Sequence, residues 1–218
     1  MNILLLHQNF PGQFLHVAAA LQATDTHNRL ALTAHTSPRS PIIPTRTYQW
    51  RSPNKQSQSG LAANYAAWAS RGTAVADALP HLRTEGYAPD AIVGHGGWGE
   101  TLFVRDIWPN VPILLHAEFF DQAQGADVGV DPETADPDPV RAAYLIRGRR
   151  VPMLQALADA TQAVTSTDWQ ASTFPAFLRS RIDVIHEGID TSIAAPDASA
   201  SLSLRRDGVN LRAGDEIV

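Results

Sequence analysis

The sequence PDAIVGHGGWGE at residues 89–100, followed by NVPILLHAEFFD at residues 110–121, decides the expected fold. Each part contains a short apolar run bounded by turn residues, which is typical of a strand buried on both faces of a sheet. A short helical segment is expected between the two runs. The stretch therefore predicts a strand, a crossover helix and a second strand parallel to the first.

Each of these two predicted strands ends on a histidine. His95 is followed by a glycine-rich turn that contains Gly97 and Trp98, and His116 is followed closely by Glu118. The carboxyl ends of parallel strands lie on one edge of the sheet, and open α/β sheets bind their ligands in the crevice outside that edge. We therefore expect the functional site beside these residues.

The start of the chain repeats the same pattern. Residues 2–6 predict a strand, residues 7–13 a loop rich in turn formers, and the apolar spacing from Phe14 to Leu21 predicts a helix. Gly12 would let backbone N–H groups approach a ligand closely, and the helix N-terminus behind it favours an anion. An ordinary strand-to-helix turn explains the same residues equally simply.

Strand and helix patterns continue to alternate along the chain. Further strands are predicted at residues 29–33, 45–48, 161–165 and 181–185, and helices at 61–82, at 140–158 and from 169. Pro80 is expected to kink or break the first of these helices. The alternation predicts an α/β, Rossmann-like, doubly wound and mainly parallel sheet with helices on both faces.

Two domains are expected from this pattern. Residues 1–190 form the Rossmann-like domain, and residues 191–218, which show little periodicity, form an extended segment leading to a further domain. The last five residues are typical of a turn that enters a strand, which suggests a fragment cut at a domain boundary.

Composition narrows the class of protein. The 218 residues carry a net charge of −5, which argues against a nucleic-acid binder with a broad basic face. No cysteine is present, which excludes disulfides, thiolate catalysis and Cys-ligated metals. No apolar run approaches the roughly 20 residues of a membrane span. We expect a soluble, cytoplasmic protein.

The histidines that follow predicted strands admit three explanations. A metal site could form from His95, His116, Glu118 and Asp121, although no zinc-protease ligand spacing is present. The imidazoles could instead cap strands by bonding to nearby backbone, as expected for His7. They could also line a pocket for a polyhydroxylated or phosphorylated ligand, with Trp98 or Phe119 packed on a sugar face.

Two clusters of charge also have alternative explanations. The acidic stretch at residues 122–139 (Asp127, Asp131, Glu133, Asp136 and Asp138) does not match an EF-hand loop, so a solvated loop is expected. The predicted helix at 140–158 carries four arginines (Arg141, Arg147, Arg149 and Arg150). They form either a solvated basic face or an anchor for a phosphate or an anionic lipid head group.

Five motifs occur in an order that resembles a known family: HQNFPGQF at 7–14, PDAIVGHGGWGETLF at 89–103, VPILLHAEFF at 111–120, STDWQ at 166–170 and VIHEGIDT at 184–191. Together they resemble the N-terminal domain of family 4 glycosyltransferases. The resemblance implies a GT-B fold, in which two Rossmann-like domains face each other across a cleft. It also implies a retaining transfer of a sugar from a nucleotide-diphosphate sugar to an acceptor, with no metal and no other cofactor.

The resemblance also implies roles for individual residues. Gly12 and Gln13 would bind the donor phosphates, and His116 would aid catalysis near the transferred sugar. The acceptor side would be formed by Asn9, Phe10, His95, Gly97, Trp98 and Glu118.

The sequence departs from the family at one point, because nothing in it corresponds to the donor-binding domain with its paired glutamates. The expected partners are a nucleotide sugar, a sugar-containing acceptor and the protein's own C-terminal domain, with no nucleic acid. Peripheral membrane contact stays open. A non-catalytic binding or interaction domain of the same fold, or half of a sugar-nucleotide epimerase, are the alternatives.

Overall fold

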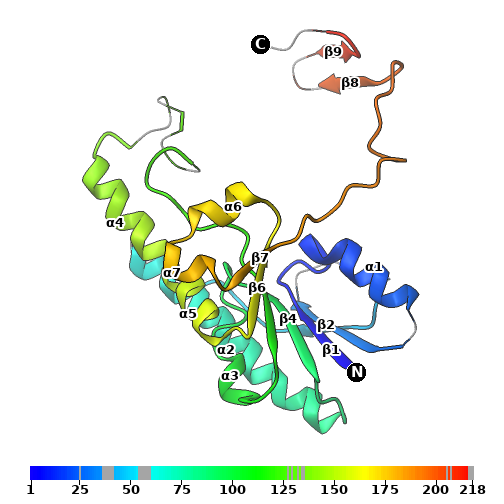
Figure 1. Cartoon of the computed structure of the whole chain (residues 1–218), viewed down its shortest axis with the longest axis vertical. Helices are drawn as coiled ribbons and strands as arrows, with labels where there is room; N and C mark the ends of the chain where they lie inside the picture. The colour runs from blue at the N-terminus through cyan, green and yellow to red at the C-terminus, as the bar shows by residue number, and fades with distance from the viewer. Residues whose placement is uncertain are drawn as a thin grey trace. The chain divides into compact units, whose positions relative to one another are not determined.

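The structure is a computed structural model that describes residues 1–24, 26–35, 42–53, 60–126, 128, 130, 131, 133, 136–204, 206 and 208–215. It divides into two compact units, Met1–His186 and Glu187–Val218. The first unit contains the alternating strands and helices drawn in Figure 1, and the second contains a short hairpin.

A seven-stranded sheet forms the centre of the first unit, and every pair of neighbouring strands in it is parallel. Its strands are β1 (Asn2–Leu6), β2 (Asn28–Ala34), β3 (Thr45–Tyr48), β4 (Ala91–His95), β5 (Ile113–His116), β6 (Gln162–Thr165) and β7 (Ile182–Val184). Their order across the sheet is β3-β2-β1-β4-β5-β6-β7. The chain moves outward from β1 to β3, returns to β4 and continues the other way, so the switch in direction lies between β1 and β4.

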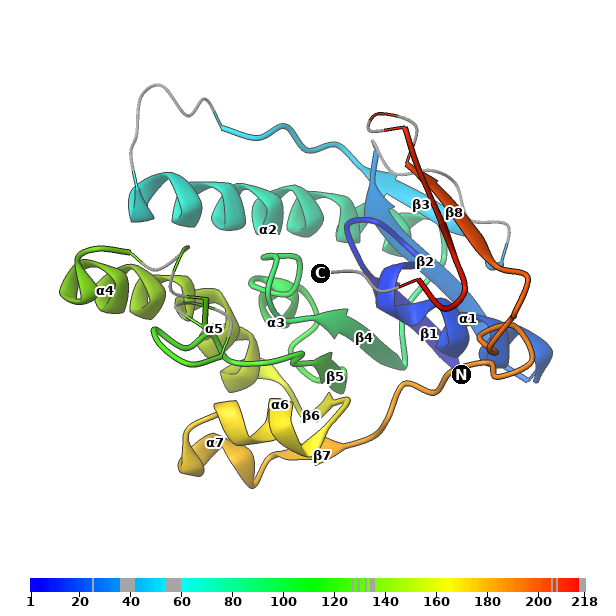
Figure 2. The same ribbon diagram turned by 90° about the horizontal axis from the view of Figure 1, so that it is seen from above.

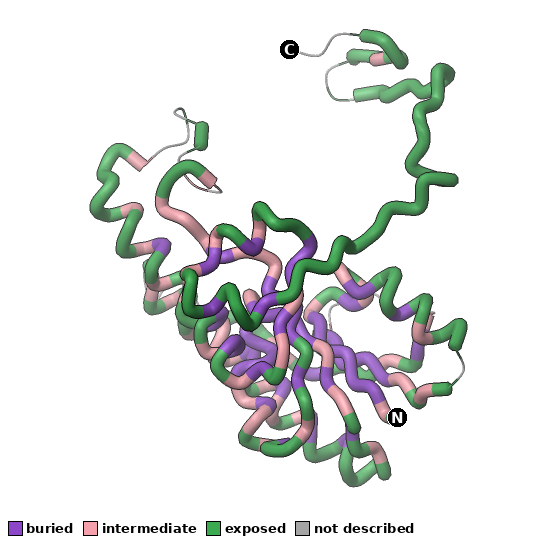
Figure 3. The backbone as a smooth tube through the Cα atoms, in the orientation of Figure 1, coloured by how far each residue is buried: buried purple, intermediate pink, exposed green. Residues whose placement is uncertain are grey.

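Helices cover both faces of this sheet. They are α1 (Leu15–Ala23, after the 3-10 turn η1, Gly12–Phe14), α2 (Leu61–Thr84), α3 (Val104–Ile107), α4 (Pro139–Arg149), α5 (Val151–Asp159), α6 (Asp168–Thr173) and α7 (Ala176–Arg179). Alternate residues of β1 face opposite layers: Leu4 and Leu6 pack with α2 and α3, whereas Ile3 and Leu5 pack with α1. Figure 2 shows α2 and α1 on opposite sides of the strands, and Figure 3 shows the buried residues concentrated along the strands. The predicted doubly wound α/β fold is confirmed.

Two helix predictions need correction. Of the kink or break expected at Pro80, the break does not occur, because helix α2 runs through Pro80 to Thr84. The single helix predicted at 140–158 is instead two helices, α4 and α5, which meet at Arg150. Pro152 explains the break, because a proline has no N–H to donate to the carbonyl four residues earlier and its ring crowds that carbonyl.

The buried face of these two helices does not follow one apolar stripe. Four of their large apolar side chains, Val140, Tyr144, Val151 and Leu154, are exposed. The buried residues are Ile146, Pro152, Met153, Ala156 and Leu157. The break at Arg150 shifts the phase of the pattern, so that no single helical period describes both segments.

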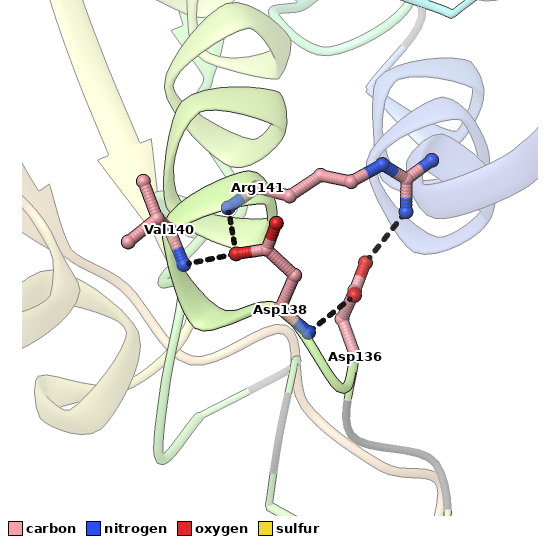
Figure 4. A network of polar contacts seen from close by, with 4 residues as sticks. All are labelled: Asp136, Asp138, Val140 and Arg141. Atoms are coloured by element: carbon pink, nitrogen blue, oxygen red, sulfur yellow. Dashed lines mark hydrogen bonds and ion pairs between the residues drawn. The ribbon is translucent and has the colours of Figure 1, made fainter.

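The start of α4 accounts for part of the acidic stretch. Asp138 Oδ1 accepts hydrogen bonds from the N–H groups of Val140 and Arg141, both at 3.0 Å, and so caps the helix (Figure 4). Asp136 Oδ2 accepts from Arg141 Nη1 at 2.9 Å. Asp127 lies outside the described residues, as do residues 36–41 and 54–59.

The second unit is a two-stranded antiparallel hairpin of β8 (Ser201–Leu204) and β9 (Val209–Arg212). Leu202 pairs with Leu211 across it, and most of its residues are exposed. Residues 191–218 were expected to form an extended segment leading to a further domain; within them the structure describes this hairpin. The final strand expected after Gly214 lies outside the described residues.

Candidate functional site

Three histidines converge at the carboxyl edge of the sheet, at the switch between β1 and β4. His7 directly follows β1, and His95 and His116 end β4 and β5 and are paired in register. The ring centroids of His7 and His95 are 5.8 Å apart, and those of His95 and His116 are 5.2 Å apart. His186, two residues after the end of β7, is exposed.

His7 has a partner for each ring nitrogen. Its Nδ1 accepts a hydrogen bond from the Asn9 N–H at 3.1 Å, so the proton is on Nε2, which lies 2.7 Å from Gln13 Oε1. Burial, opposed by the bond to Gln13, lowers the pKa of His7 to about 4. The imidazole is therefore neutral at pH 7 and holds the loop of residues 7–13 in place.

Gly12 is required by its contact with that ring. Its φ is +46°, in the left-handed region that other residues seldom adopt, and a Cβ there would lie only 2.6 Å from His7 Nε2. Contact with His7 therefore explains why a glycine is needed at position 12, independently of any role that Gly12 has in ligand binding. Gln13, the other residue assigned to the donor phosphates, accepts from His7.

His95 and Glu118 form the second polar pair of the edge. His95 Nδ1 accepts from the Gly97 N–H at 3.1 Å, which leaves the proton on Nε2. That nitrogen lies 3.2 Å from Glu118 Oε2, which is a close polar contact although it is not aligned as a hydrogen bond. The contact with His95 keeps the pKa of the Glu118 carboxyl below its usual range, so Glu118 carries its charge at pH 7.

The backbone at Glu118 is held in an uncommon conformation. Its φ is 51°, and it is the one described residue other than glycine with a positive φ. The Thr165 hydroxyl, at the end of β6, donates to the Glu118 carbonyl. Strand β6 thus fixes the turn at Glu118. In this conformation the Glu118 carboxylate is partly exposed, while His95 is buried.

A cavity of about 340 Å³ opens beside this pair, which is a volume suited to a small molecule. It is lined by Trp68, Gly97, Trp98, Glu118, Phe119, Phe120, Asp121, Arg149, Arg150 and Met153. Three of the residues expected on the acceptor side, Gly97, Trp98 and Glu118, therefore share one cavity. Phe119, expected to pack on a sugar, lines it as well.

The other expected site residues lie elsewhere. Phe10 is only 1% exposed and packs in the core with Ile3, Leu5 and Phe14, so it cannot contact an acceptor in this structure. Asn9 is exposed, but neither it nor Gly12 nor Gln13 lines the cavity. The role of Phe10 on the acceptor side was implied by the resemblance alone, whereas its ring packs in the core and anchors the loop.

His116 is nearly buried, at 8% exposure, and lies between two aromatic neighbours. Its ring centroid is 6.4 Å from that of Phe14 and 5.2 Å from that of His95. The three imidazoles, the Phe14 ring and Gly12 thus form one connected group, which borders the cavity through the contact of His95 with Glu118.

A buried polar network behind the cavity was not found from the sequence. Arg71, on α2, donates from Nη1 to the Trp98 carbonyl at 2.8 Å, and its guanidinium lies 4.0 Å from the Trp50 ring centroid. Glu100 is 1% exposed and accepts from the Tyr48 hydroxyl at 3.3 Å. Burial, opposed by Arg71, raises the pKa of the Glu100 carboxyl.

Close backbone packing reinforces that network. Gly99 has a φ of +101°, and a Cβ on Gly72 would lie 2.8 Å from the Gly99 carbonyl oxygen. Helix α2 and the turn at residues 96–100 therefore touch directly. The contact depends on Gly72 and Gly99. These two residues are far apart in the sequence and are not related by a helical or strand periodicity, so the sequence did not indicate the contact.

Two further features concern metals and membranes. Among the described residues, no group of three or more His, Asp or Glu side chains is placed to hold a metal ion. Within the same residues, no helix has both the length and the apolar character needed to cross a membrane.

The comparison with protein families gives a match over most of the chain. The model described as the glycosyl transferase family 4 group matches residues 25–194. The chain belongs to the glycosyl transferase family 4 group. Its matched segment includes β2 to β7 and the whole cavity, and the predicted family is confirmed. No curated protein matches the sequence significantly.

Solved structures that resemble this family 4 chain share its fold at low sequence identity. Os79 from O. sativa, in complex with UDP and deoxynivalenol-3-glucoside, has a TM-score of 0.54 at 12% identity, over 88% of this chain and 53% of that one. LpCGTa in complex with UDP has a TM-score of 0.53 at 16% identity, over 91% and 57%. A UDP-glucosyltransferase from Polygonum tinctorium has a TM-score of 0.52 at 10% identity, over 91% and 54%. The chain thus spans little more than half of each of these proteins.

Proposed function

We propose that this chain is the acceptor-side domain of a retaining glycosyltransferase, which moves a sugar from a nucleotide-diphosphate sugar to an acceptor bound in the cavity. The observation that carries the proposal is the cavity itself. In a chain of the family 4 group, it lies at the carboxyl edge of the sheet and is lined by Gly97, Trp98 and Glu118. Aromatic walls with a few polar groups at one end are typical of sites for small hydroxylated ligands.

Glu118 would accept a hydrogen bond from the acceptor hydroxyl. Its carboxylate is ionised and partly exposed on the cavity wall, while His95 holds it from behind. A low pKa makes it a weak base, so its role is to orient the hydroxyl and to stabilise positive charge near the transferred sugar. Proton removal from the acceptor would then fall to the leaving phosphate of the donor.

The histidine group would contact the donor side of the reaction. His116, beside Phe14 and His95, would make a polar contact to the transferred sugar. Gly12 and Gln13 precede α1, whose N-terminal end would favour the donor phosphates. Binding the nucleotide would also need a second, donor-binding domain across the cleft, so residues 1–218 alone are expected to bind nucleotide weakly and not to turn over. Neither a metal nor another cofactor is expected in the reaction.

The test is a donor screen on the full-length protein, read as released nucleotide diphosphate, followed by NMR of the product's anomeric configuration. We expect release that depends on an acceptor, and a retained configuration. Glu118→Gln should raise the acceptor KM and lower kcat, and His116→Ala should lower kcat, with folding intact in both. Absence of release with every nucleotide sugar would favour a binding domain without chemistry, and an inverted product would refute the retaining mechanism.

A further inference from the structure

The cavity is lined by two cationic side chains that the proposed reaction does not use. Besides the aromatic side chains and Glu118, it is lined by Arg149 and Arg150, which lie where α4 ends and α5 begins. The break caused by Pro152 puts two consecutive arginines at one point of the cavity wall.

Arg150 is held rigidly while part of its guanidinium stays available. Its Nε donates to the Asp121 carbonyl at 2.7 Å, and the guanidinium carbon lies 4.8 Å from the Phe120 ring centroid. Its two terminal nitrogens donate no hydrogen bond to any described residue. A stacked guanidinium with both ends of its fork open is pre-organised for a carboxylate or phosphate.

Arg149 is exposed at the same cavity and, among the described residues, has neither an ion pair nor a hydrogen bond. Arg141, on the same helix, shows the contrast, because it is paired with Asp136 at 2.9 Å. The like charges of Arg149 and Arg150 repel each other beside the aromatic walls of the cavity. A bound anion would offset this electrostatic cost.

We infer that the acceptor is a small molecule with a flat apolar face and an anionic oxygen group, a carboxylate or phosphate, that Arg149 and Arg150 bind together. The inference rests on the proposed function, which supplies the acceptor. In this proposal Trp68, Trp98 and Phe119 pack on the flat part, and the hydroxyl that receives the sugar lies against Glu118. Residues of one cavity would thus recognise both the anionic group and the hydroxyl of one acceptor.

Two acidic side chains, Glu118 and Asp121, line the cavity as well. Glu118 contacts His95 and is the residue that the proposal assigns to the acceptor hydroxyl. The cavity therefore carries both signs of charge, and a neutral or cationic acceptor is the competing outcome that the experiment must separate.

The binding test uses three probes with one frame and different charges: 4-hydroxybenzoate, 4-hydroxybenzamide and tyramine. Each is titrated into the 218-residue protein, and the indole signals of Trp68 and Trp98 are followed by NMR. We expect 4-hydroxybenzoate to bind about tenfold more tightly than the amide, as a charge-assisted bidentate contact provides. The double variant Arg149→Gln/Arg150→Gln should remove that difference.

The matched control is Arg147→Gln. Arg147 is an exposed arginine of the same helix that does not line the cavity, so its loss should leave the preference for the anion unchanged. Equal binding of the three probes, tighter binding of tyramine, or an equal effect of Arg147→Gln would overturn the inference.

Two competitors separate the sources of the anion. Inorganic phosphate should displace 4-hydroxybenzoate only at much higher concentration than 4-hydroxyphenyl phosphate does, because the ion lacks the flat group. Displacement by inorganic phosphate at the same concentration would refute joint recognition. Displacement by UDP that is lost in the double variant would assign the arginines to the donor instead.

The full-length protein distinguishes failure of the inference from failure of the proposed function. Equal transfer to all three probes, unchanged in the double variant, would refute the anionic acceptor and leave the transferase intact. Absence of transfer to any acceptor, with arginine-dependent binding of 4-hydroxybenzoate retained, would refute the transferase and leave the anion site.

Discussion

Replacing Gly12 by alanine tests the structural argument for the edge of the sheet. A φ of +46° costs a residue with a Cβ about 1–2 kcal/mol. The added methyl would lie 2.6 and 2.7 Å from the ring nitrogens of His7, so the ring must shift, which adds about 1–3 kcal/mol of overpacking. Gly12→Ala should therefore lower the free energy of unfolding by about 2–5 kcal/mol.

The matched control is Gly86→Ala. Gly86 has a φ of +83° and nothing within 4 Å of the position that a Cβ would take, so it reports the backbone strain alone. Urea unfolding followed by circular dichroism gives both values, and the difference between them measures the contact with His7. In a His7→Ala background the effect of Gly12→Ala should fall to that of Gly86→Ala. Equal destabilisation by the two single variants would refute the packing argument for Gly12.

Three further predictions concern other parts of the first unit. The pKa of His7 is about 4 in the folded protein and 6.5 in the unfolded chain, so between these values only the unfolded chain binds the proton. Stability should rise with pH across that window, on the order of 3 kcal/mol in all, and level off above it; His7→Gln should remove this part of the pH dependence of urea unfolding. Arg71→Met leaves the Trp98 carbonyl without its donor and should cost about 1–3 kcal/mol, whereas Arg46→Met breaks only an exposed ion pair and should cost less than about 1 kcal/mol; equal losses in thermal unfolding would contradict the buried network. Asp138→Ala removes the cap of α4 and should cost about 1 kcal/mol, restored in part by Asp138→Ser; a neutral Asp138→Ala in the same assay would show that the helix start does not depend on its cap.

The alternation of apolar runs was enough to predict the sheet and the edge at which its strand-end polar residues gather. Parallel strands with polar residues after them must gather those residues on one edge, so His95 and His116 could be brought together from their spacing alone. The same reasoning placed Gly97, Trp98 and Glu118 correctly beside one another. These are properties of topology, which local patterns determine well.

The far wall of the cavity could not be predicted in this way. Trp68 reaches it from α2, and Arg149 and Arg150 reach it from the break between α4 and α5. Their positions depend on how helices lie across the sheet and on where Pro152 divides a run that looked continuous. Phe10 shows the same limit, because only the packing of the loop onto the core decides that its ring points inward.

The one-to-one pairing of His95 with His116 restricts how this edge can change during evolution. Deleting a single residue inside β4 or β5 would turn one imidazole to the opposite face of the sheet and separate the pair. The connection between the two strands, residues 96–112, is not bound to that register, but Val104 and Trp108 within it are buried in the core. Diversification should therefore change its length at the exposed residues 109–110, whereas the strands themselves can tolerate substitution but not a change in count.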